Sequence, residues 1–214
     1  MKFRVILCDP PYRFNNKNTG GSMKSGSKDK YPTMSLDSLM LLPIKDITSP
    51  KAWLFLWCPA SMFLDGIGLM HQWGFDYKTV AFVWVKKCRV STEKNFWGMG
   101  FSTRQGAELC LLGTKGKPVR ASARVHQIIE APVGEHSAKP IETYQRIEKL
   151  CGKYGHRIEL FARLKKKGWY CHGNEIRGAD LKFRRHVKKL YKRYKRRRIP
   201  YSQMVVYTPE FKNA

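Results

Sequence analysis

The segment Asp9-Pro10-Pro11-Tyr12 combines residue types that suit the activation of a weakly nucleophilic amine. The lone pair of an aromatic amino group is delocalised into its ring, so acceptors must draw on its hydrogens before it can attack. The Asp9 carboxylate can supply one acceptor. The Pro10 carbonyl can supply a second, because the two prolines fix the backbone and donate no N–H. The Tyr12 ring can stack on a flipped-out or single-stranded base. A plain strand end followed by a turn is the alternative.

The elements around this segment predict a sheet edge. Residues 2–8 (KFRVILC) have strand composition and end at prolines, which places Asp9 at a strand's carboxyl end. Further strands are expected at 52–58, 77–86, 108–112, 125–131 and 156–163. Helices are expected at 36–42, at 60–73 and from Lys139-Pro140 onward. This alternation predicts an α/β fold with a mostly parallel sheet flanked by helices, and Asp9 and Arg163 at one edge. Four tryptophans in these patterns are expected in the core: Trp53, Trp57, Trp73 and Trp84.

Composition limits the class of protein. The chain has 214 residues, enough for one domain with appendages, and a net charge of +25 with a pI near 10.0. Such an excess of cations indicates a polyanionic partner, and nucleic acid is the commonest. No apolar run is long enough to cross a bilayer and no secretory signal is visible, so we expect no membrane association and a cytoplasmic location. The scattered cysteines form no C-x-x-C pair, which makes reduced core thiols the expectation and zinc improbable.

Two segments differ in composition from the rest. Residues 13–31 are rich in Gly, Ser, Asn and Lys and predict a long loop, which beside a strand end can act as a lid. Residues 177–198 hold twelve Lys or Arg against one Asp, with apolar residues at helical spacing. They predict a basic amphipathic helix that neutralises phosphates. A solvated charged helix and a membrane-surface helix are the alternatives. The cations assigned to nucleic acid are Lys188, Lys189, Lys192, Arg193 and Arg196.

Several motifs in order resemble one known family. They are DPPY, WGF at 73–75, FWGMGFSTRQGAELCLLGTKGKP at 96–118, HSAKP at 136–140, ELFAR at 159–163 and GWYCHGNE at 168–175. Together they resemble the N6-adenine methyltransferases typified by the catalytic subunit of the eukaryotic messenger-RNA adenosine methyltransferase, a family with bacterial and phage members. The resemblance covers nearly all of residues 2–175. It implies a Rossmann-like methyltransferase fold, S-adenosylmethionine as cofactor, and a permuted (beta-class) motif order with DPPY first.

The resemblance also implies roles for single residues. Asp9 and the Pro10 carbonyl would hold the target amino group, Pro11 would shape the turn and Tyr12 would stack on the base. Lys139 would meet the methionine carboxylate of the cofactor, unless it is simply a solvated lysine at a helix start. The other residues implied to line the cofactor site are Cys8, Asp9, Glu159, Arg163, Asn174 and Glu175. For Glu159 and Arg163 a surface ion pair is the alternative, and for Asn174 and Glu175 a plain turn.

Three further residues are candidates for substrate contact. His136 and Ser137 could meet substrate or cofactor, although a lone histidine is more often structural. Arg104, beside glycines in GFSTRQG, could reach a phosphate or the flipped base, or be an ordinary surface arginine.

Residues 1–176 are thus expected to form an S-adenosylmethionine-dependent N6-adenine methyltransferase domain, and residues 177–214 a basic C-terminal helix and tail. DNA is favoured over RNA, because the family's usual aromatic after the prolines is Trp and the Tyr12 found here is frequent in DNA amino methyltransferases. A bacterial or phage setting and a monomer or homodimer are expected, and no metal is required. The alternatives are an RNA enzyme, a catalytically silent nucleic-acid-binding partner subunit, and a basic packaging protein.

Overall fold

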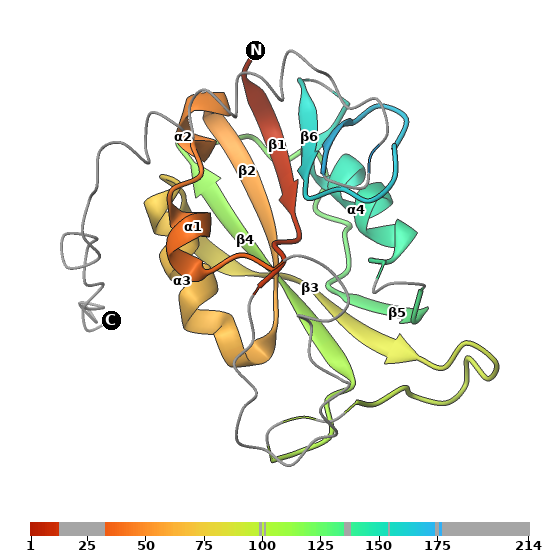
Figure 1. The fold of residues 1–214 in the computed structure, drawn as a ribbon. Helices are drawn as coiled ribbons and strands as arrows, with labels where there is room; N and C mark the ends of the chain where they lie inside the picture. The colour runs from red at the N-terminus through yellow and green to blue at the C-terminus, as the bar shows by residue number, and fades with distance from the viewer. Residues whose placement is uncertain are drawn as a thin grey trace, which may run out of the picture.

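A computed structural model describes residues 1–12, 33–98, 100, 102–134, 138–153, 155–173 and 176 of the chain. Its strands form one twisted seven-stranded sheet in the order β5-β3-β4-β2-β1-β6-β7 (Figure 1). The strands are β1 Phe3–Cys8, β2 Thr48–Cys58, β3 Asp76–Lys87, β4 Ala107–Lys115, β5 Ile128–Pro132, β6 Arg157–Leu160 and β7 Tyr170–His172. The helices are α1 Leu36–Met40, α2 Ile44–Ile47, α3 Phe63–Gln72 and α4 Ile141–Cys151, and a 3₁₀ turn at Ala60–Met62 leads into α3.

The sheet is mostly parallel, as the alternating pattern predicts. β4 alone pairs antiparallel with both of its neighbours, β2 and β3, and all other pairings are parallel. In the register of β1 with β6, Cys8 lies opposite Leu160. The residues that follow these two strands, Asp9 and Phe161, therefore leave the sheet side by side at its carboxyl edge.

The helices cover both faces of the sheet because successive residues of the central strand point to opposite sides. Ile6 and Cys8 of β1 pack in one cluster with α1, α2 and α3. Val5 and Leu7 pack in a second cluster with α4. Figure 1 shows α1, α2 and α3 on one side of the sheet and α4 on the other. The central strand β1 is thus buried on both faces, which gives Asp9 a rigid support.

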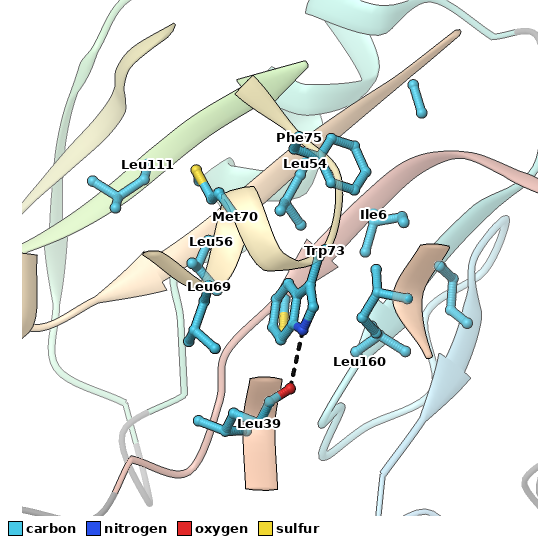
Figure 2. Close-up of a cluster of buried hydrophobic side chains, with 14 of the residues drawn as sticks. Ile6, Leu39, Leu54, Leu56, Leu69, Met70, Trp73, Phe75, Leu111 and Leu160 are labelled. Carbon is cyan, nitrogen blue, oxygen red and sulfur yellow. Dashed lines mark hydrogen bonds between the residues drawn. The ribbon is translucent and has the colours of Figure 1, made fainter. Parts of the chain in front are cut away.

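The four tryptophans expected in the core are buried there, Trp53, Trp57, Trp73 and Trp84. Trp73 fills the centre of the α1–α3 cluster, and its indole N–H donates to the Leu39 carbonyl at 3.0 Å (Figure 2). This bond joins the end of α3 to α1 while satisfying a polar group in an apolar environment.

Several element boundaries differ from the sequence-based prediction. The strand expected over 156–163 ends at Leu160, because Phe161 adopts a positive φ of 61° that a strand cannot continue. Pro140 precedes α4 as its N-cap instead of standing in its first turn, so Lys139 lies outside the helix. Two short elements were not predicted, α2 and β7, whose four and three residues are too few for a visible period.

Ser35 is the N-cap of α1, and its hydroxyl accepts a hydrogen bond from the Ser38 N–H at 3.2 Å. The cysteines Cys8, Cys58, Cys110 and Cys151 are buried thiols, and Cys88 and Cys171 are partly buried and also free.

No helix within the described ranges is both long and apolar enough to cross a membrane. The expected lid at 13–31 and the basic segment 177–214 lie outside the described residues.

Candidate active site

A pocket of about 450 Å³ opens at the carboxyl edge of the sheet, where β1 and β6 end. It is lined by residues from the end of β1, from the start of α4 and from β6 with the loop after it. The lining residues are Asp9, Ala138, Lys139, Ile141, Tyr144, Glu159, Phe161, Arg163, Leu164, Lys165 and Lys166. The volume falls in the range of small-molecule sites. Four residues assigned to the site from the sequence, Asp9, Lys139, Glu159 and Arg163, are brought together here.

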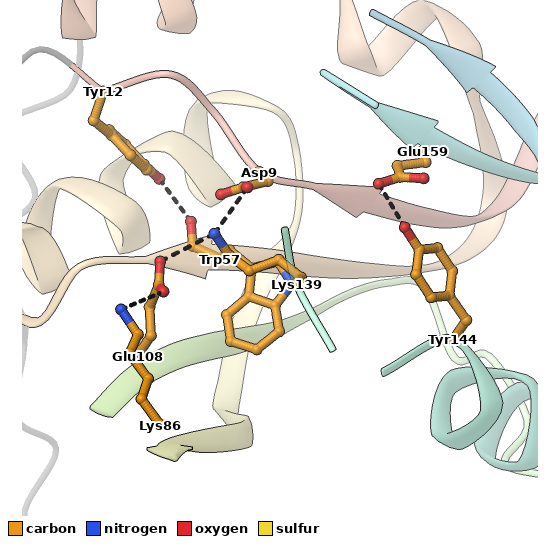
Figure 3. Close-up of polar contacts among 8 residues, drawn as sticks. All are labelled: Asp9, Tyr12, Trp57, Lys86, Glu108, Lys139, Tyr144 and Glu159. Atoms are coloured by element: carbon orange, nitrogen blue, oxygen red, sulfur yellow. Dashed lines mark hydrogen bonds and ion pairs between the residues drawn. The ribbon is translucent and has the colours of Figure 1, made fainter. Parts of the chain in front are cut away.

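A chain of alternating charges runs from Asp9 and Lys139, which line the pocket, to Glu108 and Lys86 (Figure 3). Lys139 Nζ lies 2.8 Å from Asp9 Oδ2 and 3.1 Å from Glu108 Oε1. Lys86 Nζ lies 3.2 Å from Glu108 Oε2. The Lys139 ammonium also lies over the Trp57 ring, 5.5 Å from its centroid. Each carboxylate therefore faces at least one ammonium, which stabilises the ionised forms in a largely buried place.

The pKa shifts in this chain follow from burial and from the neighbouring charges. Burial opposes the charged form of Lys139, but Asp9 and Glu108 raise its pKa above the ordinary value, so the ammonium persists. Burial raises the pKa of Asp9; the Lys139 ammonium opposes the rise and the Glu108 carboxylate adds to it. Burial also acts to raise the pKa of Glu108, but Lys139 and Lys86 together hold it below its usual value.

A second polar pair, Tyr144 and Glu159, lines the same pocket. The Tyr144 hydroxyl donates to Glu159 Oε1 at 2.8 Å, which joins α4 to β6 (Figure 3). Glu159 Oε2 is buried and accepts no hydrogen bond from the residues that the structure describes. Burial raises the pKa of Glu159 to about 7, although the Tyr144 hydrogen bond opposes this. A buried acceptor without a donor is costly, so Oε2 is suited to a ligand hydroxyl.

The DPPY backbone forms a tight turn after β1. The Pro10 carbonyl accepts the Tyr12 N–H at 2.8 Å, and the Pro11 carbonyl accepts the Met34 N–H at 2.8 Å. The Pro10 carbonyl thus already accepts one hydrogen bond, and its oxygen has a second lone pair for a further donor. The rigid turn fixes the direction of that carbonyl next to Asp9.

Tyr12 is buried, with 4% of its surface exposed, and its hydroxyl donates to the Trp57 carbonyl at 3.3 Å. In this arrangement the ring belongs to the core cluster and presents no open face. Stacking on a base therefore requires the turn to rearrange, and this role of Tyr12 stays a prediction. Cys8 is also fully buried, so its thiol does not line the pocket and only its backbone can face a ligand.

Arg104 does not join the pocket. It lies in the β3–β4 connection, where its guanidinium stacks on the Trp97 ring at 3.7 Å from the centroid. The remaining predicted site residues lie outside the described residues: His136, Ser137, Asn174, Glu175, Lys188, Lys189, Lys192, Arg193 and Arg196. Their roles stay predictions.

Two site residues were missed by the sequence-based reasoning, Glu108 and Tyr144. Glu108 had a signal, because it is an acidic residue at the start of the apolar strand ELCLL, and a half-buried carboxylate in such a strand needs a cationic partner. Tyr144 had no such signal in the sequence. Its hydrogen bond to Glu159 becomes visible only when β6 is placed beside α4.

The fold and the pocket define the class of this protein as a Rossmann-like methyltransferase, with a mostly parallel sheet, one reversed strand and a polar site at the carboxyl edge. The MT-A70 family model matches residues 3–175, and the chain belongs to that family. This match confirms the predicted family, the predicted Rossmann-like fold and the prediction that the protein is a methyltransferase.

Known relatives are of two kinds. The type II methyltransferase M.MunI of Mycoplasma sp. is 35% identical over 191 residues, which cover 82% of this chain and 78% of that protein. The METTL3 catalytic subunit of the human N(6)-adenosine-methyltransferase is 28% identical, over 84% of this chain and 29% of its own length. An MT-A70-like N(6)-adenosine-methyltransferase of Arabidopsis thaliana is 29% identical, over 84% of this chain and 24% of its own. The chain thus spans less than a third of these eukaryotic proteins.

Proposed function

We propose that this protein transfers a methyl group from S-adenosylmethionine to the N6 amino group of adenine in nucleic acid, and that DNA is its preferred substrate. The observation that carries the proposal is the position of Asp9. Its side chain is 25% exposed and lines the pocket, and Lys139 contacts Oδ2 alone. The other carboxylate oxygen, Oδ1, is suited to accept a hydrogen of an incoming amino group.

The residues of the pocket fit S-adenosylmethionine, whose sulfonium supplies a methyl group that is already activated for transfer. Glu159 Oε2, buried without a donor among the described residues, is suited to accept a ribose hydroxyl. Lys139 uses two ammonium hydrogens on Asp9 and Glu108, and a third donor remains for the carboxylate of the methionine part. Arg163, Lys165 and Lys166 add positive charge to the same wall.

The chemistry at the amino group follows from the Asp9 turn. Asp9 Oδ1 and the second lone pair of the Pro10 carbonyl accept the two amino hydrogens, which draws the nitrogen lone pair out of the aromatic ring. The Asp9 carboxylate also stabilises the positive charge that develops on the nitrogen during attack, and bulk solvent can take up the released proton. Lys139 positions Asp9 and favours its ionised form. Positioning and electrostatics thus supply the catalysis.

Two observations support DNA as the preferred substrate. M.MunI is named a type II methyltransferase and shares 35% identity, against 28% for the human adenosine methyltransferase. The aromatic residue after the prolines is Tyr12, as in many DNA amino methyltransferases. The net charge of +25 supports a nucleic acid of either kind.

A competition experiment tests the choice of substrate. Equal amounts of a DNA strand and an RNA strand of matched sequence, each with one adenine, are offered together with labelled S-adenosylmethionine. We expect kcat/KM to be at least about tenfold higher for DNA, in single- or double-stranded form, which is a difference of about 1.4 kcal/mol in transition-state binding. Equal labelling of both strands, or more label in RNA, would overturn the preference for DNA.

A further inference from the structure

The connection between β3 and β4 carries an exposed pair of stacked side chains, Trp97 and Arg104. Two backbone hydrogen bonds between Gly98 and Gln105, of 2.8 and 3.0 Å, bring the two arms of the connection together beside this pair. The Arg104 guanidinium carbon lies 3.7 Å from the Trp97 ring centroid. The Trp97 side chain is 54% exposed, so most of the indole is not used for packing.

This stacking positions Arg104 without using its hydrogen-bond donors. A guanidinium that lies flat on an aromatic ring keeps its N–H groups free in its own plane, in the fork that matches two oxygens of a phosphate. In the described part of the chain, the Arg104 guanidinium makes no ion pair with a carboxylate. The neighbouring Lys86 and Lys87, in contrast, are paired with Glu108 and Glu130. The Arg104 guanidinium is therefore held in place by Trp97, and no carboxylate in the described part of the chain neutralises its charge.

The pair lies at the same edge of the sheet as the pocket. β3 runs in the same direction as β1, because β1 is parallel to β2 and β4 is antiparallel to both β2 and β3. The carboxyl end of β3 and the connection after it therefore extend from the edge where β1 ends (Figure 1). Arg104 precedes Glu108 by four residues, so their Cα atoms are at most about 14 Å apart. Glu108 contacts Lys139, which contacts Asp9. A strand whose adenine reaches Asp9 can thus extend along the connection.

We propose that Arg104, held by Trp97, binds a backbone phosphate of the nucleic-acid strand beside the target adenine. Arg104 makes the contact, and Trp97 is a positioning residue. The proposal rests on the proposed function, because it places a nucleic-acid strand at the Asp9 pocket. It differs from the general attraction of a basic chain in predicting one geometrically defined phosphate contact near the reacting base.

The salt dependence of binding tests this contact. The affinity of the full chain for a single-stranded oligonucleotide with one adenine is measured between low and moderate salt, in the presence of S-adenosylmethionine. For Arg104→Ala we expect about tenfold weaker binding at low salt. The slope of log K against log salt should become shallower by about 0.7, the value for one lost phosphate contact on a single strand. Affinity for S-adenosylmethionine should not change.

Further variants separate geometry from charge. Arg104→Lys should keep the slope and lose about threefold in affinity, because an ammonium lacks the planar fork. Trp97→Ala should weaken binding about threefold at an unchanged slope, and Trp97→Phe should restore most of the loss. Arg120→Ala is the matched control, because Arg120 is exposed on the segment after β4 at the opposite edge of the sheet. Its slope should equal that of the unchanged protein.

An Arg104→Ala variant with the slope of the unchanged protein would overturn the phosphate contact, whatever its affinity. A loss of S-adenosylmethionine binding in the same variant would also overturn it, because it would show a structural role. The readout is independent of catalysis. If the unchanged protein transfers no methyl group but the slope responds as expected, the proposed function fails and the phosphate site stands. If transfer proceeds and the slope does not respond, the phosphate site fails alone.

Discussion

The ammonium of Lys139 lies 2.8 Å from the carboxylate of Asp9, although 130 positions separate the two residues in the chain. Lys139 lies just before α4, and α4 packs in one cluster with Val5 and Leu7 of β1, which brings the lysine to the end of that strand. A residue expected to bind the cofactor thus also orients the residue expected to hold the substrate. The same ammonium also contacts Glu108, so one charged group links the two carboxylates.

Replacing Lys139 should shift the pH dependence of catalysis. The Lys139 ammonium lowers the pKa of Asp9, whereas burial and Glu108 raise it. In Lys139→Met the lowering influence is lost, so the pKa of Asp9 rises and less of it is ionised at a given pH. The acidic limb of the kcat profile should therefore move to higher pH, and part of the lost activity should return under alkaline conditions. A profile of unchanged shape with a uniformly lower rate would contradict this role.

Glu108→Gln should destabilise the protein. The change leaves Lys86 and Lys139 without a carboxylate between them, in a place where the Glu108 side chain is only 16% exposed. We expect the free energy of unfolding to fall by about 1–3 kcal/mol, measured by urea denaturation. Glu130→Gln is the matched control, because its pair with Lys87 has 59% of the Glu130 side chain exposed and should change stability by less than about 1 kcal/mol. Equal losses in both variants would refute a special role for the buried carboxylate.

Affinity for S-adenosylmethionine should rise with pH around neutrality. Burial raises the pKa of Glu159 to about 7, so below this value the folded protein carries the protonated form. A ribose hydroxyl donates better to the ionised carboxylate, so binding should tighten as pH increases through 7, by up to about tenfold per pH unit on the acidic side. Calorimetric titrations between about pH 5.5 and 8.5 check this. Glu159→Gln should remove this pH dependence of affinity. If the affinity of both proteins changed with pH in the same way, the result would argue against a contact between Glu159 and the ribose hydroxyl.

Glu159 also affects stability, with a defined sign. Its folded-state pKa of about 7 exceeds the ordinary value of 4.5, so the folded protein holds this proton more tightly than the unfolded chain. Its contribution to the free energy of unfolding is therefore fully present below about pH 4.5 and is lost as pH rises to about 7. Without cofactor, Glu159→Gln should be relatively more stable than the unchanged protein at pH 8 than at pH 5. Thermal unfolding at both pH values measures the difference, and the reverse order would contradict the assignment.

Trp73→Ala should remove much of the stability of the fold. The side chain is fully buried and its N–H donates to the Leu39 carbonyl, so the change creates a cavity and removes this hydrogen bond between the end of α3 and α1 (Figure 2). A loss of about 3–5 kcal/mol is expected in denaturant unfolding. Leu64→Ala on α3, where Leu64 is 80% exposed, should change stability by no more than about 0.5 kcal/mol. A small effect of Trp73→Ala would show that this cluster does not anchor α3.

Much of the fold can be predicted from this sequence because its strands are strongly apolar and end at clear signals. Pro10 and Pro59 stop β1 and β2, and the apolar spacing of 60–73 predicts α3 to within a few residues. The end of β6 could not be predicted, since the positive φ of Phe161 reflects the tertiary path of the chain. The antiparallel direction of β4 is likewise fixed by its pairing with β2 and β3.

The candidate site was predictable to a similar degree. Motifs distant in sequence identified Asp9, Lys139, Glu159 and Arg163, and the structure places them around one pocket. Their partners Glu108 and Tyr144 were not predictable, because each joins the site through a contact between different parts of the fold: Glu108 with Lys139, and Tyr144 with Glu159. The burial of Tyr12 was also unexpected, since an aromatic residue after two prolines gives no signal of whether it packs inward.

The most direct test of the central claim is analysis of the nucleosides in DNA that has been incubated with the protein and methyl-labelled S-adenosylmethionine. The account predicts N6-methyladenine as the labelled product. It also predicts that Asp9→Ala lowers kcat by at least about a hundredfold while S-adenosylmethionine still binds. Asp76→Ala, which removes an exposed carboxylate at the start of β3, should retain full activity. Label in another nucleoside, or turnover by Asp9→Ala at the rate of the unchanged protein, would contradict the account.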